Sequence, residues 1–372
     1  MTQSLPGAPD LHPGARRGST RWADRVQDIV TNVGVKAIPW IPTPAKRLIF
    51  GGRSIIIDGN TLDPTLQLAL SASRLSGIEG LDVNDDPVAS RAQMRQTLLS
   101  LPGPQIHVMV DDLTIPGPAG EIGARHYRPA GAGPADLLVF YHGGGWTIGD
   151  LDTADALCRL TCRDAGIQVL SIDYRLAPEH PAPAAIDDAY AAFKWAHDHA
   201  GELGANPGRV AVGGDSAGGN LAAVVCQLAR DEDAPAPLLQ WLIYPRTDFT
   251  AQNRSLSLFA RGFLLTKRDI DWFTAEYLNG TGIDLTDPRV SPAHAQSLSG
   301  LAPALIAVAG FDPLRDEGQA YAAALQGAGT PVDLRYMGSL THGFASLFQL
   351  GGASAAATSD LISALRAHLS RA

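Results

Sequence analysis

Short apolar runs alternate with longer amphipathic stretches over the last two thirds of the chain. The apolar runs are rich in β-branched residues and predict strands at 137–141, 168–172, 209–212, 239–243, 304–309 and 332–336. The stretches between and after them have helical spacing and predict helices at 153–164, 184–199, 217–231, 316–328 and 354–370. This alternation predicts an α/β fold, with a mostly parallel sheet and helices on both of its faces.

Two more apolar runs precede this region, at 106–115 and 121–127. They are separated by Pro116-Gly117-Pro118-Ala119-Gly120, a composition that is typical of a turn. We therefore expect an antiparallel hairpin that precedes the parallel strands. With it, the sheet has eight strands.

The first hundred or so residues have a different pattern, in which helical spacing recurs with no predicted strand between the helices. The helical patterns cover residues 21–33, 64–75 and 87–99, and a separate one at 263–278 interrupts the strand series. We assign 1–105 to an N-terminal helical cap segment and 106–372 to a catalytic domain with a cap insertion at about 248–285. The two helical pieces are expected to meet over the sheet.

Charge limits the partners of the chain. Its 372 residues include 29 Lys+Arg and 38 Asp+Glu, a formal net charge of -9. Such a balance repels phosphate backbones and anionic membrane surfaces, so we expect no nucleic-acid partner. The length suits one large catalytic domain with an appendage. The oligomeric state is not determined by these features, and a homodimer stays open.

The beginning of the sequence is polar and shows no secretory signal, so we expect a cytoplasmic protein. The most apolar early stretch, 35–57, contains three prolines and four Lys or Arg residues, which argues against a transmembrane segment. Peripheral contact with lipid through Trp22, Trp40 and their apolar neighbours is left open.

The cysteines predict no disulfide framework, because there are only three of them: Cys158, Cys162 and Cys226. Cys158 and Cys162 are one helical turn apart, but two thiols without further ligands make a poor metal site. We expect all three to be buried as small hydrophobic residues.

One candidate nucleophile stands at the junction of a predicted strand and a predicted helix. Gly214-Asp215-Ser216-Ala217-Gly218 follows the strand at 209–212 directly and precedes the helix. A serine on such a sharp turn is exposed at the edge of the sheet, and glycines two residues before and after it avoid collisions. The amide of Ala217, at the positive end of the helix, can stabilise an oxyanion. The alternative is a glycine-rich turn in which Ser216 only caps the helix.

A second glycine-rich segment, His142-Gly143-Gly144-Gly145-Trp146, follows the strand at 137–141. Its glycines leave backbone amides free to point inward, so Gly144 and Gly145, with Gly143 as a further candidate, are predicted oxyanion donors. No Lys or Ser/Thr follows at the spacing of a phosphate-binding loop. We expect His142 to brace the loop.

An activated serine needs a base, and the base needs a third group that fixes its tautomer. Among ten histidines, His342 is the best placed, since it follows the last predicted strand and precedes the last helix. Asp312 follows the strand at 304–309 directly, at the edge where chemistry collects in parallel sheets. Asp316 and Glu317 are rivals, but we expect them to interact with the dipole of the following helix.

These segments resemble the bacterial hormone-sensitive-lipase-like esterases, also called family IV lipolytic enzymes, and the N-terminal region resembles mycobacterial-type Lip carboxylesterases. The resemblance covers the chain from about Leu138 to the C-terminus. Its motifs are His142-Gly143-Gly144-Gly145, Asp173-Tyr174-Arg175-Leu176-Ala177-Pro178-Glu179, Gly214-Asp215-Ser216-Ala217-Gly218-Gly219, Asp312-Pro313-Leu314 and His342-Gly343-Phe344. The stretch Arg289-Val290-Ser291-Pro292 is similar to the family as well, and we interpret it as structural support.

The resemblance implies an α/β-hydrolase fold and a helical cap over a pocket for short- to medium-chain carboxylic esters. Ser216, His342 and Asp312 would form the triad, without a metal or an organic cofactor, and the partner would be a small-molecule ester. Two other readings remain: an amidase on the same triad, or a non-catalytic small-molecule receptor on the same fold. The presence of His342 argues against the receptor.

Overall fold

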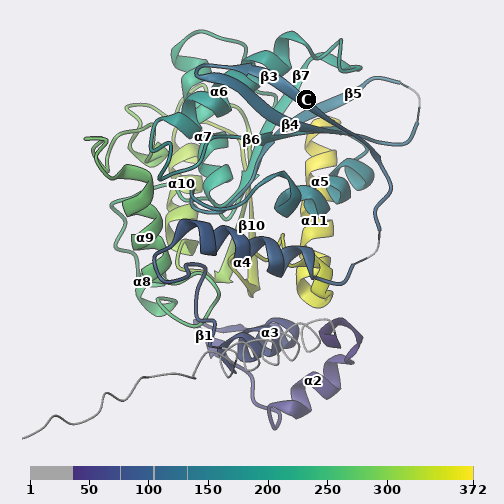
Figure 1. Cartoon of the computed structure of the whole chain (residues 1–372), viewed down its shortest axis with the longest axis vertical. Coiled ribbons are helices and arrows are strands. Elements are labelled where there is room, and N and C mark those ends of the chain that lie inside the picture. Colours follow the sequence, from purple (N-terminus) through teal and green to yellow (C-terminus); the bar gives the residue numbers. More distant parts are fainter. Residues whose placement is uncertain (1–36, 76, 104, 132, 372) are drawn as a thin grey trace, which may run out of the picture.

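The computed structural model describes residues 37–75, 77–103, 105–131 and 133–371. Its centre is an eight-stranded sheet in the order β10-β9-β8-β7-β5-β6-β4-β3 (Figure 1). The hairpin strands β3 and β4 are antiparallel to each other, and β4 is antiparallel to β6, whereas the other neighbours are parallel. The strands are β3 (Met109–Gly117), β4 (Gly120–Arg128), β5 (Ala135–Tyr141), β6 (Gln168–Asp173), β7 (Ala205–Asp215), β8 (Gln240–Ile243), β9 (Ala304–Phe311) and β10 (Val332–Thr341). The predicted α/β-hydrolase architecture is confirmed.

Helices cover both faces of this sheet (Figure 1). One face carries α6 (Ala184–Asp198), α7 (Ala217–Asp231) and α10 (Arg315–Gly327), and the other carries α5 (Leu151–Ala165) and α11 (Gly352–Leu369). Two short 3-10 helices, η2 (Pro292–His294) and η3 (Phe348–Leu350), lie in the connections.

The central strand β5 shows why two helical layers are needed. Leu137, Val139 and Tyr141 pack into the core under α6, α7 and α10, while Leu138 and Phe140 pack into the core under α5 and α11. All five are at most 1% exposed. Because successive side chains of a strand point to opposite faces, an uninterrupted apolar run requires cover on both sides.

The N-terminal segment is mostly helical, with one small exception. It contains η1 (Ile38–Trp40), α2 (Thr43–Ile49), β1 (Ile56–Ile57), β2 (Asn60–Thr61), α3 (Pro64–Leu75) and α4 (Pro87–Leu99). The prediction that no strand separates its helices was wrong, because β1 and β2 pair across Asp58 and Gly59. Both of these residues have positive φ, 53° and 76°, as a two-residue hairpin turn requires. The predicted helix at 21–33 lies outside the described residues.

Arg91 attaches α4 to the catalytic core. Its Nε donates to the Thr147 carbonyl oxygen and its Nη2 to the Ala177 carbonyl oxygen, each at 2.8 Å, and it pairs with Glu179 at 2.6 Å. Glu179 and Ala177 belong to the segment that follows β6, so α4 is held against the loops at the edge of the sheet.

The insertion after β8 forms α8 (Arg254–Leu258) and α9 (Lys267–Leu278). The predicted helix began at residue 263, four residues too early, because Thr266 ends the preceding loop as the N-cap. Its hydroxyl accepts from the Asp269 amide at 3.0 Å, and the Thr266 amide donates to Asp269 Oδ2 at 2.8 Å. This reciprocal capping fixes where α9 begins.

The insertion and the N-terminal segment contact each other directly. Asp269 Oδ1 accepts from the amides of Leu81 and Asp82 at 2.8 and 3.0 Å. Arg74 donates to the Gly262 carbonyl at 2.7 Å. Burial and contact with Asp269 raise the pKa of Asp82. The proposed domain boundaries themselves stay a prediction.

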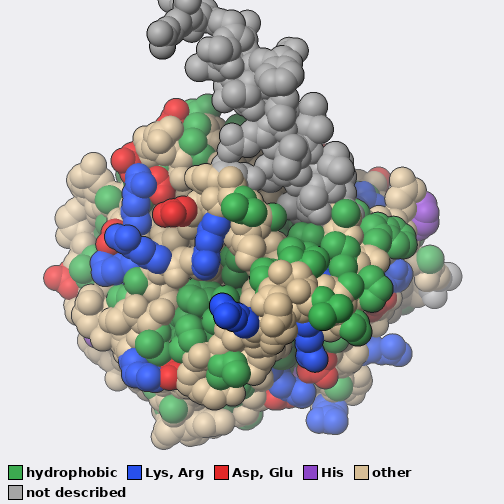
Figure 2. Space-filling model, turned by 90° about the horizontal axis from the view of Figure 1, so that it is seen from below, with side chains coloured by type: hydrophobic (Ala, Val, Ile, Leu, Met, Phe, Trp, Pro, Cys, Tyr) green, Lys and Arg blue, Asp and Glu red, His purple; other side chains and the backbone are tan. Residues whose placement is uncertain are grey.

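The underside of the molecule is partly apolar. Helix α2 and strand β1 lie at the bottom of Figure 1, and Figure 2, the view from below, shows hydrophobic side chains gathered on one part of that face. Trp40 is 83% exposed and Leu48 76% exposed. None of the helices in the described ranges has the length and apolar character that crossing a membrane requires.

The three cysteines are buried and unpaired with one another, as expected. Burial raises the pKa of Cys162 to about 12, and it raises the pKa of Cys158 and Cys226 further. Their thiols therefore stay protonated near neutral pH and act as packing groups.

Candidate active site

Ser216 occupies a strained turn between β7 and α7. Its φ and ψ are 56° and -114°, a conformation that side-chain-bearing residues seldom adopt. A Cβ at Gly214 would lie 2.3 Å from the Tyr141 carbonyl oxygen, and one at Gly218 would lie 1.8 Å from the same atom. The two glycines are therefore required for the close approach of the turn to β5, as the motif predicted.

Ser216, His342 and Asp312 meet at the carboxyl edge of the sheet. His342 Nε2 lies 2.9 Å from Ser216 Oγ, and His342 Nδ1 lies 2.8 Å from Asp312 Oδ2. Asp312 is fully buried and His342 is 4% exposed. With its Nδ1–H donating to the carboxylate, the imidazole presents Nε2 as an acceptor to the serine hydroxyl.

Each member of this chain of hydrogen bonds is positioned by its surroundings. Asp312 Oδ1 accepts from the Leu314 amide at 2.8 Å, which fixes the carboxylate after the end of β9. The Tyr244 ring packs against His342 with ring centroids 4.6 Å apart. The Ser216 amide donates to the Ile243 carbonyl at 2.8 Å. The three side chains thus come from separate strand ends, each tied to the sheet.

The glycine-rich loop after β5 contributes two residues to the cavity that Ser216 lines. Gly144 and Gly145 line the same cavity as Ser216 and Ala217. They have φ of 121° and 56°, and within the described residues neither amide donates to a protein acceptor. The Ala217 amide opens α7, where no intrahelical acceptor exists. These amides are available to an oxygen near Ser216.

Gly143 must be removed from the predicted oxyanion donors. Its amide donates to Asp215 Oδ1 at 2.8 Å, and it does not line the cavity. Asp215 is buried, and burial raises the pKa of its carboxyl group. Asp215 therefore holds the glycine-rich loop in place from the neighbouring strand, a role that the sequence analysis did not assign.

His142 lies in the position that was expected for a bracing residue. Its Nδ1 is 2.8 Å from the Gly143 carbonyl oxygen, and its ring stacks on Tyr174 with centroids 4.3 Å apart. It has no hydrogen bond to Ser216.

The two acidic rivals of Asp312 do not reach His342. Asp316 accepts from the Ser255 amide at 2.8 Å, and Glu317 accepts from the Thr247 amide at 2.7 Å. Both lie in the first turn of α10, as predicted. Glu317, however, does more than interact with the helix dipole, because it is buried and pairs with Arg246 at 2.7 Å. Burial raises the pKa of Glu317 to about 7.

Ser291, in the stretch that was interpreted as structural support, connects the insertion to the core. Its hydroxyl accepts from the Phe249 amide at 2.8 Å and donates to the Leu285 carbonyl at 2.6 Å. Asn220, in the first turn of α7, also donates to the Val290 carbonyl at 2.7 Å. The stretch thus joins α7 to the loop after β8.

A cavity of about 90 Å³ surrounds Ser216 and His342. Its roof is apolar and is built from segments far apart in the sequence: Leu81, Met94, Leu264, Leu265, Ile270 and Phe273. These residues come from the N-terminal segment and from the insertion around α9. Nothing in the sequence pattern distinguished these six residues from ordinary core residues. Arg246 is the one Lys or Arg among the described cavity-lining residues, and no sequence motif had marked it either.

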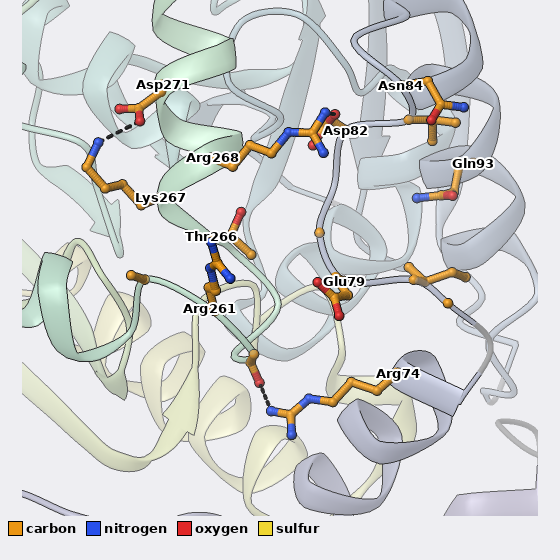
Figure 3. Close-up of a pocket in the computed structure, with 16 residues that line it drawn as sticks. Arg74, Glu79, Asp82, Asn84, Gln93, Arg261, Thr266, Lys267, Arg268 and Asp271 are labelled. Carbon is orange, nitrogen blue, oxygen red and sulfur yellow. Dashed lines mark hydrogen bonds and ion pairs between the residues drawn. The ribbon is translucent and has the colours of Figure 1, made fainter.

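A wider groove of about 1250 Å³, most of whose lining residues are polar, is formed by the same two segments as this roof (Figure 3). Basic and acidic side chains alternate along it, and Figure 3 shows Lys267 paired with Asp271 and Arg74 bonded to the backbone. Leu264 and Gly262 border a smaller cavity between the groove and the roof. The segment 262–266 therefore separates the polar groove from the apolar cavity.

The sequence matches known proteins at the level of a family. Residues 138–346 match a family model described as alpha/beta hydrolase fold. A carboxylic ester hydrolase of Mycobacterium tuberculosis, LipN, is 73% identical over 376 residues, covering 100% of this chain and 100% of that protein. Esterase LipI of the same organism is 42% identical over 314 residues, covering 82% of this chain and 94% of that protein.

Solved structures of esterases superpose on this chain as well. A thermostable esterase from Pseudomonas putida superposes with a TM-score of 0.77 at 34% sequence identity, covering 82% of this chain and 96% of that one. An ester hydrolase from the metagenome of Lake Arreo, complexed with a derivative of bipyridine phosphonate, superposes with a TM-score of 0.76 at 40% identity, covering 84% of this chain and 99% of that one.

Proposed function

The chain belongs to the α/β-hydrolase fold family and is a carboxylic-ester hydrolase, and from that premise we propose that it cleaves short- to medium-chain esters through Ser216, His342 and Asp312. The observation that carries the proposal is the pair of hydrogen bonds, 2.9 Å from Ser216 Oγ to His342 Nε2 and 2.8 Å from His342 Nδ1 to Asp312 Oδ2. A nucleophile, a base and an orienting carboxylate in this geometry are the side chains that acyl transfer by a serine uses.

In the first half of the reaction, Ser216 Oγ attacks the ester carbonyl carbon while His342 Nε2 takes the hydroxyl proton. The carbonyl oxygen becomes an oxyanion that accepts hydrogen bonds from the amides of Gly144, Gly145 and Ala217. The tetrahedral intermediate collapses as the C–O bond to the alcohol breaks. His342 returns the proton to the departing alkoxide, and an acyl-enzyme remains.

In the second half, His342 removes a proton from a water molecule, which attacks the acyl carbon of the acyl-enzyme. The second tetrahedral intermediate uses the same three amides. Its collapse breaks the bond to Ser216 Oγ, which recovers its proton from His342. Asp312 holds the imidazole in one orientation throughout.

We also propose that the N-terminal segment and the insertion together act as the cap of this pocket. The cavity of about 90 Å³ is smaller than the roughly 150 Å³ that an engineered protein cavity uses to hold benzene, so a short acyl group fits it best. Longer acyl groups would require the apolar roof to move. Amide bonds have poorer leaving groups, and on this triad we expect ester cleavage to be faster.

The test combines turnover with labelling. Hydrolysis of p-nitrophenyl esters from acetate to palmitate is measured for the wild type and for Ser216→Ala, and the wild type is treated with a serine-directed organophosphate and mapped by mass spectrometry. We expect activity to be highest for short chains, the adduct to lie on Ser216, and the variant to lose at least about 10⁴-fold in kcat. A matched p-nitroanilide series compares amides with esters.

Ser363→Ala is the matched control, because Ser363 is exposed on α11 and is not among the residues that line the cavity. It should retain wild-type turnover. Near-normal activity of Ser216→Ala, or an adduct on another serine, would end the assignment. Binding of esters without turnover in the wild type would favour the receptor reading instead.

A further inference from the structure

A buried charged pair reaches the wall of the cavity through one of its two members. Arg246 lines the cavity together with Ser216 and His342, and its Nη1 donates to Glu317 Oε2 at 2.7 Å. Arg246 is 7% exposed and Glu317 is 4% exposed. Burying an ion pair costs free energy that its own attraction seldom recovers in full. The proposed triad mechanism uses neither residue, so the position of the pair needs another explanation.

Both carboxylate oxygens of Glu317 accept hydrogen bonds from the protein, whereas most N–H donors of Arg246 have no acceptor within the described residues. Glu317 accepts from the amides of Thr247 and Asp248 with Oε1, at 2.7 and 3.4 Å, and from Arg246 with Oε2. A guanidinium has five N–H donors. Within the described part of the chain, Glu317 is the one hydrogen-bond partner of the Arg246 side chain. No nitrogen of Arg246 is both fully buried and without a hydrogen-bond partner, so its remaining donors are accessible.

The guanidinium is also held in place. It lies over the Phe249 ring, 5.0 Å from the centroid. The Arg246 carbonyl oxygen accepts from Asn220 Nδ2 at 2.9 Å, and Asn220 stands one helical turn after Ser216 on α7. Backbone and side chain are therefore both fixed relative to the nucleophile. A donor that is fixed in advance discriminates between ligands better than a mobile one.

The charges around Arg246 determine which kind of substrate group its free donors bind best. Above the pKa of about 7 that burial gives Glu317, its carboxylate neutralises Arg246, and Asp215 lines the same cavity. A substrate carboxylate would meet a field that is neutral or negative, whereas an uncharged oxygen acceptor would gain a charge-assisted hydrogen bond without added repulsion.

We propose that Arg246 is a specificity-determining residue that donates a hydrogen bond to an uncharged oxygen, such as a ketone or a second ester carbonyl, on the substrate. The inference rests on the proposed esterase function of the same cavity. The preferred substrates are accordingly short esters with an additional carbonyl oxygen, rather than simple fatty esters. A substrate without that oxygen leaves buried donors unpaired, which is how polar sites reject apolar analogues.

The test uses three esters of nearly equal shape: ethyl levulinate with a ketone, ethyl isocaproate with a methyl branch, and monoethyl succinate with a carboxylate. Acetonyl acetate and isobutyl acetate form the corresponding pair with the ketone in the alcohol half. We measure kcat/KM by titrating the released acid at a constant pH above the pKa of Glu317. The enzymes are the wild type, Arg246→Met combined with Glu317→Gln, Glu317→Gln alone, and Arg254→Met as the control on an exposed arginine.

We expect the ratio of kcat/KM for a ketone ester to that for its branched analogue to fall about tenfold to a hundredfold in the double variant, in at least one of the two pairs. Taking the ratio between enzymes cancels the intrinsic reactivity of each ester. Glu317→Gln keeps the donors and removes the neutralising charge, so it should raise the relative rate on monoethyl succinate. Arg254→Met should leave every ratio unchanged.

Unchanged ratios in the double variant, with turnover of the branched esters still measurable and a thermal melt like that of the wild type, would overturn the role of Arg246. If the double variant does not fold, Glu317→Gln decides: no gain on monoethyl succinate counts against the proposal. Failure of the esterase assignment is distinct, because Ser216→Ala would then still turn over ethyl isocaproate.

Discussion

The edge of the sheet and the roof of the cavity are built in opposite ways. At the edge, Ser216, Asp312 and His342 each follow a strand end, and backbone geometry places them. The roof consists of side chains such as Met94 and Phe273, which come from segments joined by contacts like those of Asp269. A strained turn between a buried strand and a helix has few alternatives, whereas an apolar roof tolerates other residues of similar volume. The edge therefore fixes the proposed chemistry, and the roof can adjust which substrate enters.

The largest effect is expected from a substitution at the edge of the sheet. Asp312→Asn keeps the size of the side chain, but its amide NH₂ can donate a hydrogen bond to His342 Nδ1, which would favour the wrong tautomer for a base. We expect kcat to fall about 10⁴-fold near neutral pH, with little change in the thermal melt. The measurement is kcat on p-nitrophenyl butyrate.

Asp316→Asn is the control for Asp312→Asn, because Asp316 lies four residues further on and bonds to Ser255 rather than to His342. Its kcat should stay within a few-fold of the wild type. If both variants lost activity equally, the assignment of the acid to Asp312 would be refuted.

The second prediction concerns the junction between edge and roof. A Cβ at Gly145 would lie 2.2 Å from the Phe273 ring, and Gly145 has a φ of 56°. Gly145→Ala should shift the loop and its amides, lowering kcat/KM about 100- to 1000-fold. Adding Phe273→Ala removes the clash. If the collision with Phe273 contributes more than the backbone strain at residue 145, the double variant should recover part of the lost kcat/KM.

Gly166→Ala is the matched control for Gly145→Ala. Gly166 has a φ of 69° at the end of α5, and a Cβ there would meet no atom within 4 Å. It carries the same backbone strain, of about 1 kcal/mol, without a collision. We expect a small loss of stability and unchanged turnover. A comparable loss of turnover in this control would show that strain alone explains the Gly145 result.

The smallest effect is expected from the roof itself. The two carboxylate oxygens of Asp269 accept from the backbone amides of Leu81, Asp82 and Thr266. Asp269→Asn replaces one of these oxygens with an NH₂ group, so at least one backbone amide loses its acceptor. We expect a loss of about 2 kcal/mol in unfolding free energy and a rise in KM larger than the fall in kcat. Urea unfolding and steady-state kinetics measure the two effects.

Asp271→Asn, on the exposed side of α9, should change stability by less than about 0.5 kcal/mol, since its pair with Lys267 is solvent-exposed. A fall in kcat with unchanged KM in Asp269→Asn would contradict the separation of edge and roof, because it would mean that the roof positions the reacting groups.

Local patterns were sufficient to predict most of the fold. The apolar run at 137–141 predicted a strand buried on both faces, and the glycines around Ser216 predicted the strained turn, because both signals lie within a few consecutive residues. The hairpin of β1 and β2 was missed although Asp58-Gly59 signals it, since its strands are only two residues long. The start of α9 was placed too early because apolar spacing continues through residues 263–265, and only the cap at Thr266 ends the loop.

The sequence by itself determined the order of strands and helices, the turn at Ser216 and the positions of His342 and Asp312 after strand ends, because each depends on neighbours in the chain. Only the tertiary structure decided that the amide of Gly143 donates to Asp215, that Leu81 and Phe273 share one roof, and that Arg246 in the cavity wall pairs with Glu317. Arg246 and Glu317 are separated by 71 residues, and their pairing depends on how α10 packs beside the end of β8. Such contacts follow from the packing of whole elements, which no local pattern encodes.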